Sequence, residues 1–354
     1  MDLITAWFRR HFSDPQVVIL AVLLVIGFAV IIIFGHMLAP VLASIVIAYL
    51  LEGLVGFLHR QRVSRLLAVI LVYSAFMAYV VFVLIGLMPL LTRQLSQLFQ
   101  QLPTMIERGQ TLLMHLPERY PSLITAQQVA DIINSLRTDI GQAGQQVVSY
   151  SLTSVLNVIT VLVYLVVMPL LVFFFLKDKQ RIIAWFTGFL PRERGLATQV
   201  WSDVDQQIAN YVRGKFVEIL IVWAVSYLTF ALMGLNFAML LGVLMGLSVI
   251  IPYIGAVVVT VPVALIAYFQ WGWGSEFAYL MLAYTVIHAL DGNLLVPLLF
   301  SEVVNLHPIA IIVAVLVFGG LWGFWGVFFA IPLATLVQAV LKAWPRQSGE
   351  AAAV

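Results

Sequence analysis

The chain of 354 residues has no cysteine and few charged residues, and both shortages limit what it can be. Without cysteine it can form no disulfide framework, no thiolate metal site and no cysteine nucleophile. Charged residues make up 10% of the chain, whereas a soluble domain has about 25%. Hydrophobic residues make up 63%, and the mean hydropathy is +1.06. The sequence therefore predicts that lipid, rather than water, surrounds most of the protein.

Motifs of enzymes are missing too. The sequence contains no HExxH, GxSxG or Walker A motif. We therefore expect no enzymatic activity, no cofactor, no metal centre and no hydrolysis of ATP by the chain itself. The formal charge of +2 comes from dispersed basic residues, which predicts no nucleic-acid partner.

Apolar segments fill most of the chain, and many approach the ~20 residues that a helix needs to cross a bilayer. Two further tracts are each long enough for two passes, and both are interrupted by glycine and proline. The predicted fold class is an all-α, polytopic helical membrane protein with Gly/Pro-broken helical hairpins. Single spans are predicted at 17–34, 37–58, 66–91, 150–176, 216–235 and 277–300, and the two long tracts are 236–270 and 305–342.

Lysine and arginine predict the orientation of these spans, because both are enriched in cytoplasmic loops. They gather before the first span, after the second, after the fourth and beyond the last. Alternating the spans places all these groups on one side, which predicts cytoplasmic termini and an even number of crossings. Residues 92–149 then lie outside, where leucines at helical spacing predict amphipathic helices.

The spans and loops divide the chain into six predicted parts. The first three spans form an N-terminal scaffold, and the last third forms a transport unit with two span-plus-hairpin repeats. The parts are the scaffold 1–91, the extracytoplasmic amphipathic segment 92–149, the fourth span 150–176, the cytoplasmic or interfacial helical segment 177–215, the transport unit 216–342 and the cytoplasmic tail 343–354.

The two long tracts resemble each other as an inverted repeat. A polar residue opens each tract, and a glycine follows nineteen positions later, from 236 to 255 and from 307 to 326. The predicted topology enters the tracts from opposite sides, as inverted repeats of transporters do. Ordinary hairpins with turns in water are the alternative. The predicted hinge and hairpin residues are Pro252, Gly255, Pro262, Gly319, Gly320, Gly323, Gly326 and Pro332.

Asp291 is the strongest candidate for a transport site, because it is an acid inside an apolar span and such residues usually serve function. Pro297 has no N–H, so it leaves the carbonyl of Asn293 without its helical partner, and Gly292 loosens the same turn. Oxygen groups of this kind suit a proton, Na⁺ or the hydroxyls of a solute. His288 shares the face of Asp291 and is a candidate proton relay.

Three further polar residues complete the candidate ion- and substrate-binding set. Glu218 follows Lys215 by three positions, which favours an interfacial ion pair over a transport site. Glu52 lies near the cytoplasmic end of its span and faces either a neighbouring subunit or the pore. Asn236 is the polar residue that opens the first tract.

Six segments, in order, resemble the AI-2E family of bacterial permease-like proteins, and most closely its PerM-like branch. The resemblance implies a protein of the bacterial inner membrane that assembles as a ring of subunits, such as a pentamer. It also implies export of a small polar solute, such as autoinducer-2, or Na⁺/H⁺ exchange. The family often has a Glu-Asn-Asn-like triplet where this chain has Asp291-Gly292-Asn293, which leaves the solute open. The segments are FFFLKDK (173–179), YVRGK (211–215), IPYIGAVV (251–258), DGNLLVPLLF (291–300), LHP (306–308) and FGGLWGFWGVFFAIPLA (318–334).

Three functions therefore compete. The leading hypothesis is a secondary transporter or exporter that is driven by a H⁺ or Na⁺ gradient and works as a homo-oligomer in the lipid bilayer. The second is a passive, channel-like facilitator. The third is a membrane scaffold whose working part is the segment 92–149.

Overall fold

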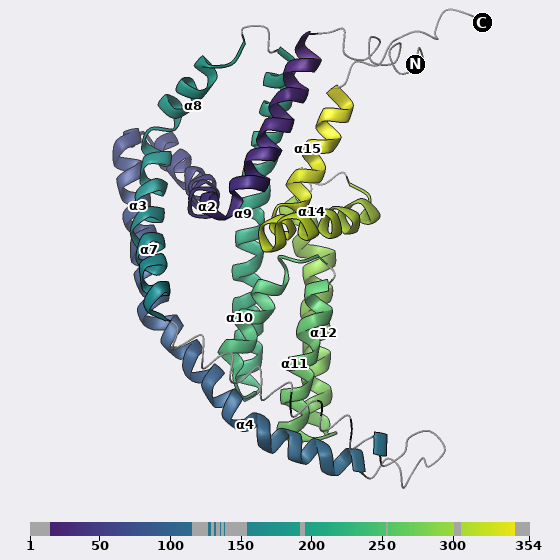
Figure 1. Cartoon of the computed structure of the whole chain (residues 1–354). Coiled ribbons are helices and arrows are strands. Elements are labelled where there is room, and N and C mark those ends of the chain that lie inside the picture. The colour runs from purple at the N-terminus through teal and green to yellow at the C-terminus, as the bar shows by residue number, and fades with distance from the viewer. Residues whose placement is uncertain are drawn as a thin grey trace, which may run out of the picture.

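A computed structural model describes residues 15–114, 154–191, 195–252, 254–300 and 306–343, with a few helical positions between 127 and 138. Within these residues every regular element is a helix and none is a strand (Figure 1). This confirms the predicted all-α fold class.

The first described element is a long, bent helix, α2 (Pro15–Arg60), which contains Pro40. Two stretches of α2 are each long and apolar enough to cross a membrane, Gln16–Gly35 and Met37–Arg60. Figure 1 shows that α2 changes direction strongly along its length. Glycine and proline allow such bends, and by length and composition the two stretches agree with the predicted spans 17–34 and 37–58.

A continuous helical rod follows, built from α3 (Arg65–Phe82), the π-helical segment η1 (Val83–Leu87) and α4 (Met88–Met114). Its last part, α4, curves beneath the other helices as an arm (Figure 1). Gln94 Oε1 accepts a hydrogen bond of 2.9 Å from the Leu240 N–H, and Leu91 and Leu98 pack on the main core. The predicted amphipathic helix is therefore present over 92–114, and most of 115–149 lies outside the described residues.

Three helices of the middle region join the first part to the last. The helix α7 (Ser154–Lys177) packs against α2 and α3 around a core that includes Val55, Val69 and Val172. The short helix α8 (Lys179–Gly188) exposes Trp185 and Phe189, as expected for an interfacial helix. The helix α9 (Gly195–Leu232) then runs through the centre of the molecule (Figure 1).

The last third packs around α9. Its largest core lies between α9, α10, α11 and α12 and contains the fully buried residues Phe230, Leu241, Met245, Val263 and Leu280. The α14 region lies across the long axis of this group (Figure 1). Its elements are α10 (Ala238–Ser248), α11 (Ile254–Trp271), α12 (Ser275–Leu290), η2 (Asp291–Leu295), α13 (Val296–Phe300), α14 (Pro308–Phe328) and α15 (Ala330–Ala343).

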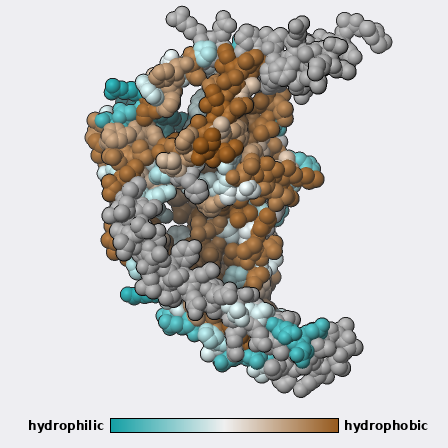
Figure 2. Space-filling view, viewed as in Figure 1, coloured by the Kyte–Doolittle hydropathy of each residue, from teal (hydrophilic) through white to brown (hydrophobic). Residues whose placement is uncertain are grey.

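The surface is that of a protein surrounded by lipid. Hydrophobic residues cover most of the face in Figure 2, whereas hydrophilic residues gather along the α4 arm. Within the described residues, seven helices are long and apolar enough to cross a membrane. The protein is therefore a multi-pass membrane protein. The start of α2 and the end of α15 lie at one end and α4 at the other (Figure 1), an arrangement compatible with the predicted orientation, which stays a prediction.

Candidate functional site

A cavity of about 420 Å³ lies where the two broken hairpins meet α9 and the Asp291 segment. Four separate parts of the last third contribute to its wall, so it exists only in the folded protein. The wall consists of Tyr211, Lys215 and Glu218 from α9, Ser248, Val249, Ile251, Pro252 and Ala256 from the first hairpin, His288, Asp291, Gly292, Val296, Pro297 and Phe300, and Ile311 and Ile331 from the second hairpin.

The first hairpin is a short helix folded tightly onto a longer one. At 11 residues and ~1.5 Å per residue, α10 is too short to cross a bilayer. The chain turns after Ser248 and returns as α11. A Cβ atom added to Gly255 would lie 1.8 Å from the carbonyl oxygen of Ser248. The predicted glycine is therefore the residue that lets the two helices meet.

The second hairpin repeats this arrangement. A Cβ atom added to Gly326 would lie 1.8 Å from the carbonyl oxygen of Phe318, and one added to Gly319 would lie 2.8 Å from Val327. Gly323 has a φ of 58° inside α14, a backbone conformation that glycine adopts without strain. The chain therefore folds back within α14, and both hairpins close over a glycine as the proposed repeat requires.

The predicted prolines of the two tracts do not all mark turns. Pro252 lies in the first turn and contributes to the cavity wall. Pro262 lies inside α11 and Pro332 inside α15, and both helices continue through them. Pro262 and Pro332 therefore lie within the helices after the turns, and their role as hinge or hairpin residues stays a prediction. Gly320 has open space around its Cα and imposes no close contact.

Lys215 and Glu218 form an ion pair inside the protein. Their charged atoms are 2.6 Å apart, and their side chains are only 5% and 2% exposed. The Lys215 ammonium also donates a hydrogen bond of 3.0 Å to the carbonyl of Val249, in the first hairpin turn. The predicted pair therefore exists, but it is buried against the cavity instead of reaching the membrane interface, because α10 and its turn cover this side of α9.

Asp291 and His288 face the same cavity from α12 and η2. The Oδ1 atom of Asp291 and the Nε2 atom of His288 are buried without a hydrogen-bond partner among the described residues. The His288 ring packs edge-on against Tyr284, with ring centroids 4.6 Å apart. Asp291 also interacts electrostatically with Lys215 and Glu218. Lys215 is thus a cation that acts on Asp291 from another helix, although its ammonium is ion-paired with Glu218.

The turn around Asp291 is a π-helix rather than a simple proline break. The Val296 N–H bonds back to the carbonyl of Asp291, and such π segments are frequent at functional sites. Asn293 turns its side chain to the helix itself, where its amide donates a hydrogen bond of 2.8 Å to the carbonyl of Ala289. The expected convergence of Asp291 and Asn293 on one ligand does not occur in this structure.

Asn236 lies far from the cavity, at the opposite end of α10. It is exposed, and its backbone N–H donates a hydrogen bond of 2.8 Å to Gln270 Oε1. Gln270 also donates from its side chain to the carbonyl of Gly234. These contacts fasten the start of α10 to the end of α11, so the structure gives Asn236 a place in that junction and none at the cavity.

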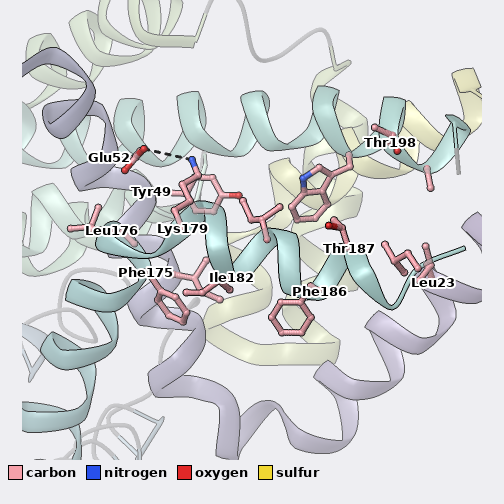
Figure 3. A pocket seen from close by; sticks show the side chains of 16 residues that line it. Leu23, Tyr49, Glu52, Phe175, Leu176, Lys179, Ile182, Phe186, Thr187 and Thr198 are labelled. Atoms are coloured by element: carbon pink, nitrogen blue, oxygen red, sulfur yellow. Dashed lines mark ion pairs between the residues drawn. The ribbon is translucent and has the colours of Figure 1, made fainter. Parts of the chain in front are cut away.

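Glu52 belongs to a second cleft, of about 620 Å³, between α2, α8 and α9 (Figure 3). One of its oxygens lies 3.2 Å from Arg65 and 3.9 Å from Lys179. Tyr49 donates a hydrogen bond from its hydroxyl to Asp205 across the same cleft. Most of the remaining wall is apolar, with Leu23, Ile182 and Phe186 among its residues. The structure therefore separates Glu52 from the acids of the first cavity.

Sequence reasoning missed three residues of the cavity. Lys215 was noticed only as a partner of Glu218, and neither Tyr211 nor Ser248 was considered. The hydroxyl of Tyr211 donates a hydrogen bond of 3.1 Å to the carbonyl of Phe328, which ties α9 to the second hairpin. The available signal was a lysine three residues before an acid in an apolar helix. Two such residues can be buried together as an ion pair, because each neutralises the charge of the other.

The fold places a polar cavity between two broken helical hairpins of a multi-pass membrane protein, an arrangement that occurs in membrane transporters. A sequence model of the "AI-2E family transporter" family matches residues 20–346. The chain belongs to the AI-2E family.

Known relatives agree with this assignment. The chain is 47% identical to "Putative permease PerM" of Escherichia coli (strain K12) over 345 residues, which is 98% of each chain. It is 27% identical to "Putative transport protein YueF" of Bacillus subtilis (strain 168) over 308 residues, covering 85% of this chain and 82% of the relative. It is 25% identical to "AI-2 transport protein TqsA" of Escherichia coli (strain K12) over 333 residues, covering 91% and 92%. These relatives are permeases and transport proteins by name, not enzymes.

Proposed function

We propose that the protein is a secondary transporter of the inner membrane that moves a small polar solute and couples this movement to H⁺ or Na⁺. The cavity between the hairpins is the proposed site. One observation supports this most: Asp291 places a buried, unpartnered carboxylate oxygen at a cavity whose other acid is already paired. A buried charge without a partner is costly, and a proton or cation relieves that cost.

The chemistry of the wall favours a small solute with hydroxyl or carbonyl groups. Ser248, His288 and Asp291 offer hydrogen-bonding groups, while Ile251, Val296 and other apolar residues enclose the remaining volume. A cavity of about 420 Å³ falls within the usual range for small-molecule sites. Because the relative TqsA is named for AI-2 transport, that signal belongs in any panel of candidate solutes.

Flux into proteoliposomes tests the proposal. The full chain is reconstituted, and uptake of AI-2 and of other small polyols and hydroxyketones is measured with imposed pH and sodium gradients. Wild-type flux is expected to saturate and to respond to one gradient, and Asp291→Asn is expected to abolish that response. Glu276→Gln removes an exposed acid from the same helix and serves as the matched control.

Two outcomes would contradict the proposal. Flux that neither saturates nor responds to either gradient would indicate the channel-like facilitator. Gradient-driven flux that Asp291→Asn leaves unchanged would show that the cavity is not the coupling site.

Orientation and assembly belong to the proposal as well. Because the chain has no cysteine, single introduced cysteines report topology without interference. Gln101→Cys, on α4, is expected to react with an impermeant maleimide in intact cells, and Arg181→Cys, on α8, only after permeabilisation. The reverse pattern would overturn the cytoplasmic placement of both termini. We also propose a homo-oligomer, such as a pentamer, which the mass of the detergent-solubilised protein tests.

A further inference from the structure

The described wall of the cavity contains a small set of charges. Of the residues in its wall, Tyr211, Lys215, Glu218, His288 and Asp291 can titrate. Among the described residues of the wall, the first hairpin contributes no titratable or charged group, and the second contributes only Ile311 and Ile331. The phenol of Tyr211 is engaged with the carbonyl of Phe328. With Tyr211 and His288 neutral, one lysine faces two carboxylates.

Lys215 is held in place by one contact on its own helix and one in the turn of the first hairpin. Its ammonium lies 2.6 Å from Glu218 and 3.0 Å from the carbonyl oxygen of Val249. Its side chain is 5% exposed, so both contacts are largely shielded from solvent. Lys215 therefore behaves as a resident cation that neutralises one of the two acids, and the carboxylate of Asp291 keeps a buried oxygen without a partner.

We infer that Lys215 fixes the number of positive charges that the site accepts at one, an inference that rests on the proposed function. A buried cavity is most stable when its charges sum to zero. One lysine and two ionised acids sum to minus one, and a single proton or Na⁺ at Asp291 brings the sum to zero. A divalent cation would leave the cavity with an excess positive charge. The ligand class is thus one monovalent cation per closed site.

Substitutions that change the resident charge should change this number in a defined order. Glu218→Gln frees Lys215 to neutralise Asp291, and the cavity then needs no added cation. Lys215→Gln leaves two acids and no lysine, and the cavity needs two. The double variant Lys215→Gln/Glu218→Gln leaves Asp291 alone and needs one, as in the wild type. A purely structural ion pair would not produce this order.

Infrared difference spectroscopy measures the number without a transported solute. The full chain is reconstituted in liposomes, and the carbonyl stretching band of protonated carboxyl groups is followed through a pH titration and normalised to the amide band. Subtracting the Asp291→Asn/Glu218→Gln spectrum removes the signal of all other acids. The expected amplitudes are one carboxyl for the wild type, none for Glu218→Gln, two for Lys215→Gln and one for the double variant. The cavity shares these protons, so amplitudes are assigned to it as a whole.

Controls and a sodium arm make the test decisive. Lys215→Arg keeps the charge, His288→Gln removes the neutral imidazole, and both should give the wild-type amplitude. If Lys215→Gln does not fold, the double variant and Glu218→Gln still decide the order. Added Na⁺ that lowers the wild-type band identifies Na⁺ as a competing ligand, and no change identifies the proton; both agree with one charge. A wild-type band that Glu218→Gln leaves intact would overturn the inference, whether or not the protein transports.

Discussion

The molecule contains two clefts that each hold a glutamate and a lysine, and the surroundings of the two pairs differ. In the cleft of Figure 3, Glu52 is shared between Arg65 and Lys179, whose side chains are 35% and 34% exposed. In the cavity between the hairpins, Lys215 and Glu218 are almost completely buried. Solvent screens the first pair more than the second. Glutamate and lysine therefore form a weak, solvent-exposed contact in the cleft of Figure 3. In the cavity between the hairpins, the same two residue types form a buried ion pair whose charges are fixed in place.

The largest expected effect comes from breaking the buried pair. Lys215→Met leaves the carboxylate of Glu218 buried without its partner, and such changes destabilise proteins by about 3–5 kcal/mol. Lys179→Met, in the other cleft, is expected to cost less than about 1 kcal/mol, because that pair is exposed. Unfolding midpoints of the two purified variants in denaturant measure the difference. Equal unfolding midpoints for the two variants would mean that the buried pair stabilises the protein no more than the exposed pair does.

The hairpin glycines should give the next largest effect, because they shape the wall of one cavity only. Gly255→Ala and Gly326→Ala place a methyl group against a backbone carbonyl, and overpacking of this kind costs about 1–3 kcal/mol. Gly27 lies on α2, one turn after Leu23 in the wall of the cleft of Figure 3. A methyl group added by Gly27→Ala meets nothing within 4 Å and should not destabilise the protein. Thermal unfolding of the three variants tests this. A loss in Gly27→Ala as large as in the other two would mean that packing does not explain the result.

The smallest expected effect concerns the polar residues that lie outside the cavity. Asn293→Leu removes only the hydrogen bond to Ala289, and Glu52→Gln weakens an exposed ion pair. Both variants should transport within about twofold of the wild type, which corresponds to less than 1 kcal/mol. The same flux assay as for Asp291→Asn measures them. A loss of coupling in Glu52→Gln would move the functional site to the other cleft.

Much of the fold follows from the sequence, because membrane spans are set by length and composition. The two spans within α2, the amphipathic helix after residue 91 and the broken hairpins all follow from apolar runs and glycine placement. The pairing of Gly255 with Gly326 was predictable from equal spacing alone, and both glycines support the same close approach to a carbonyl. Apolar runs and glycine positions predict membrane helices well, because the bilayer allows few other backbone arrangements.

The candidate site was only partly predictable, because it depends on which helices meet. Asp291, His288 and Pro252, which the sequence singles out, line one cavity, although nothing in their own segments indicates that Lys215 lines it too. Asn293 was placed at the site because it is adjacent to Asp291, yet a π-helical turn and a bond to Ala289 direct its side chain elsewhere. Contacts between distant helices and departures from regular helix geometry leave little trace in one sequence.

The arrangement of the buried charges also has a consequence for biogenesis. A lysine or an acid at the centre of a span raises the cost of its insertion by ~2.5–3.5 kcal/mol. Lys215 and Glu218 are three residues apart on one helix, so they can neutralise each other while α9 enters the membrane alone. The segment of Asp291 carries no lysine or arginine of its own, so a proton on Asp291 lowers the cost of inserting that segment. Glu218 therefore inserts with its counter-ion on the same helix. Asp291 inserts at lower cost when it carries a proton, which is the ion-bound form of the proposed site.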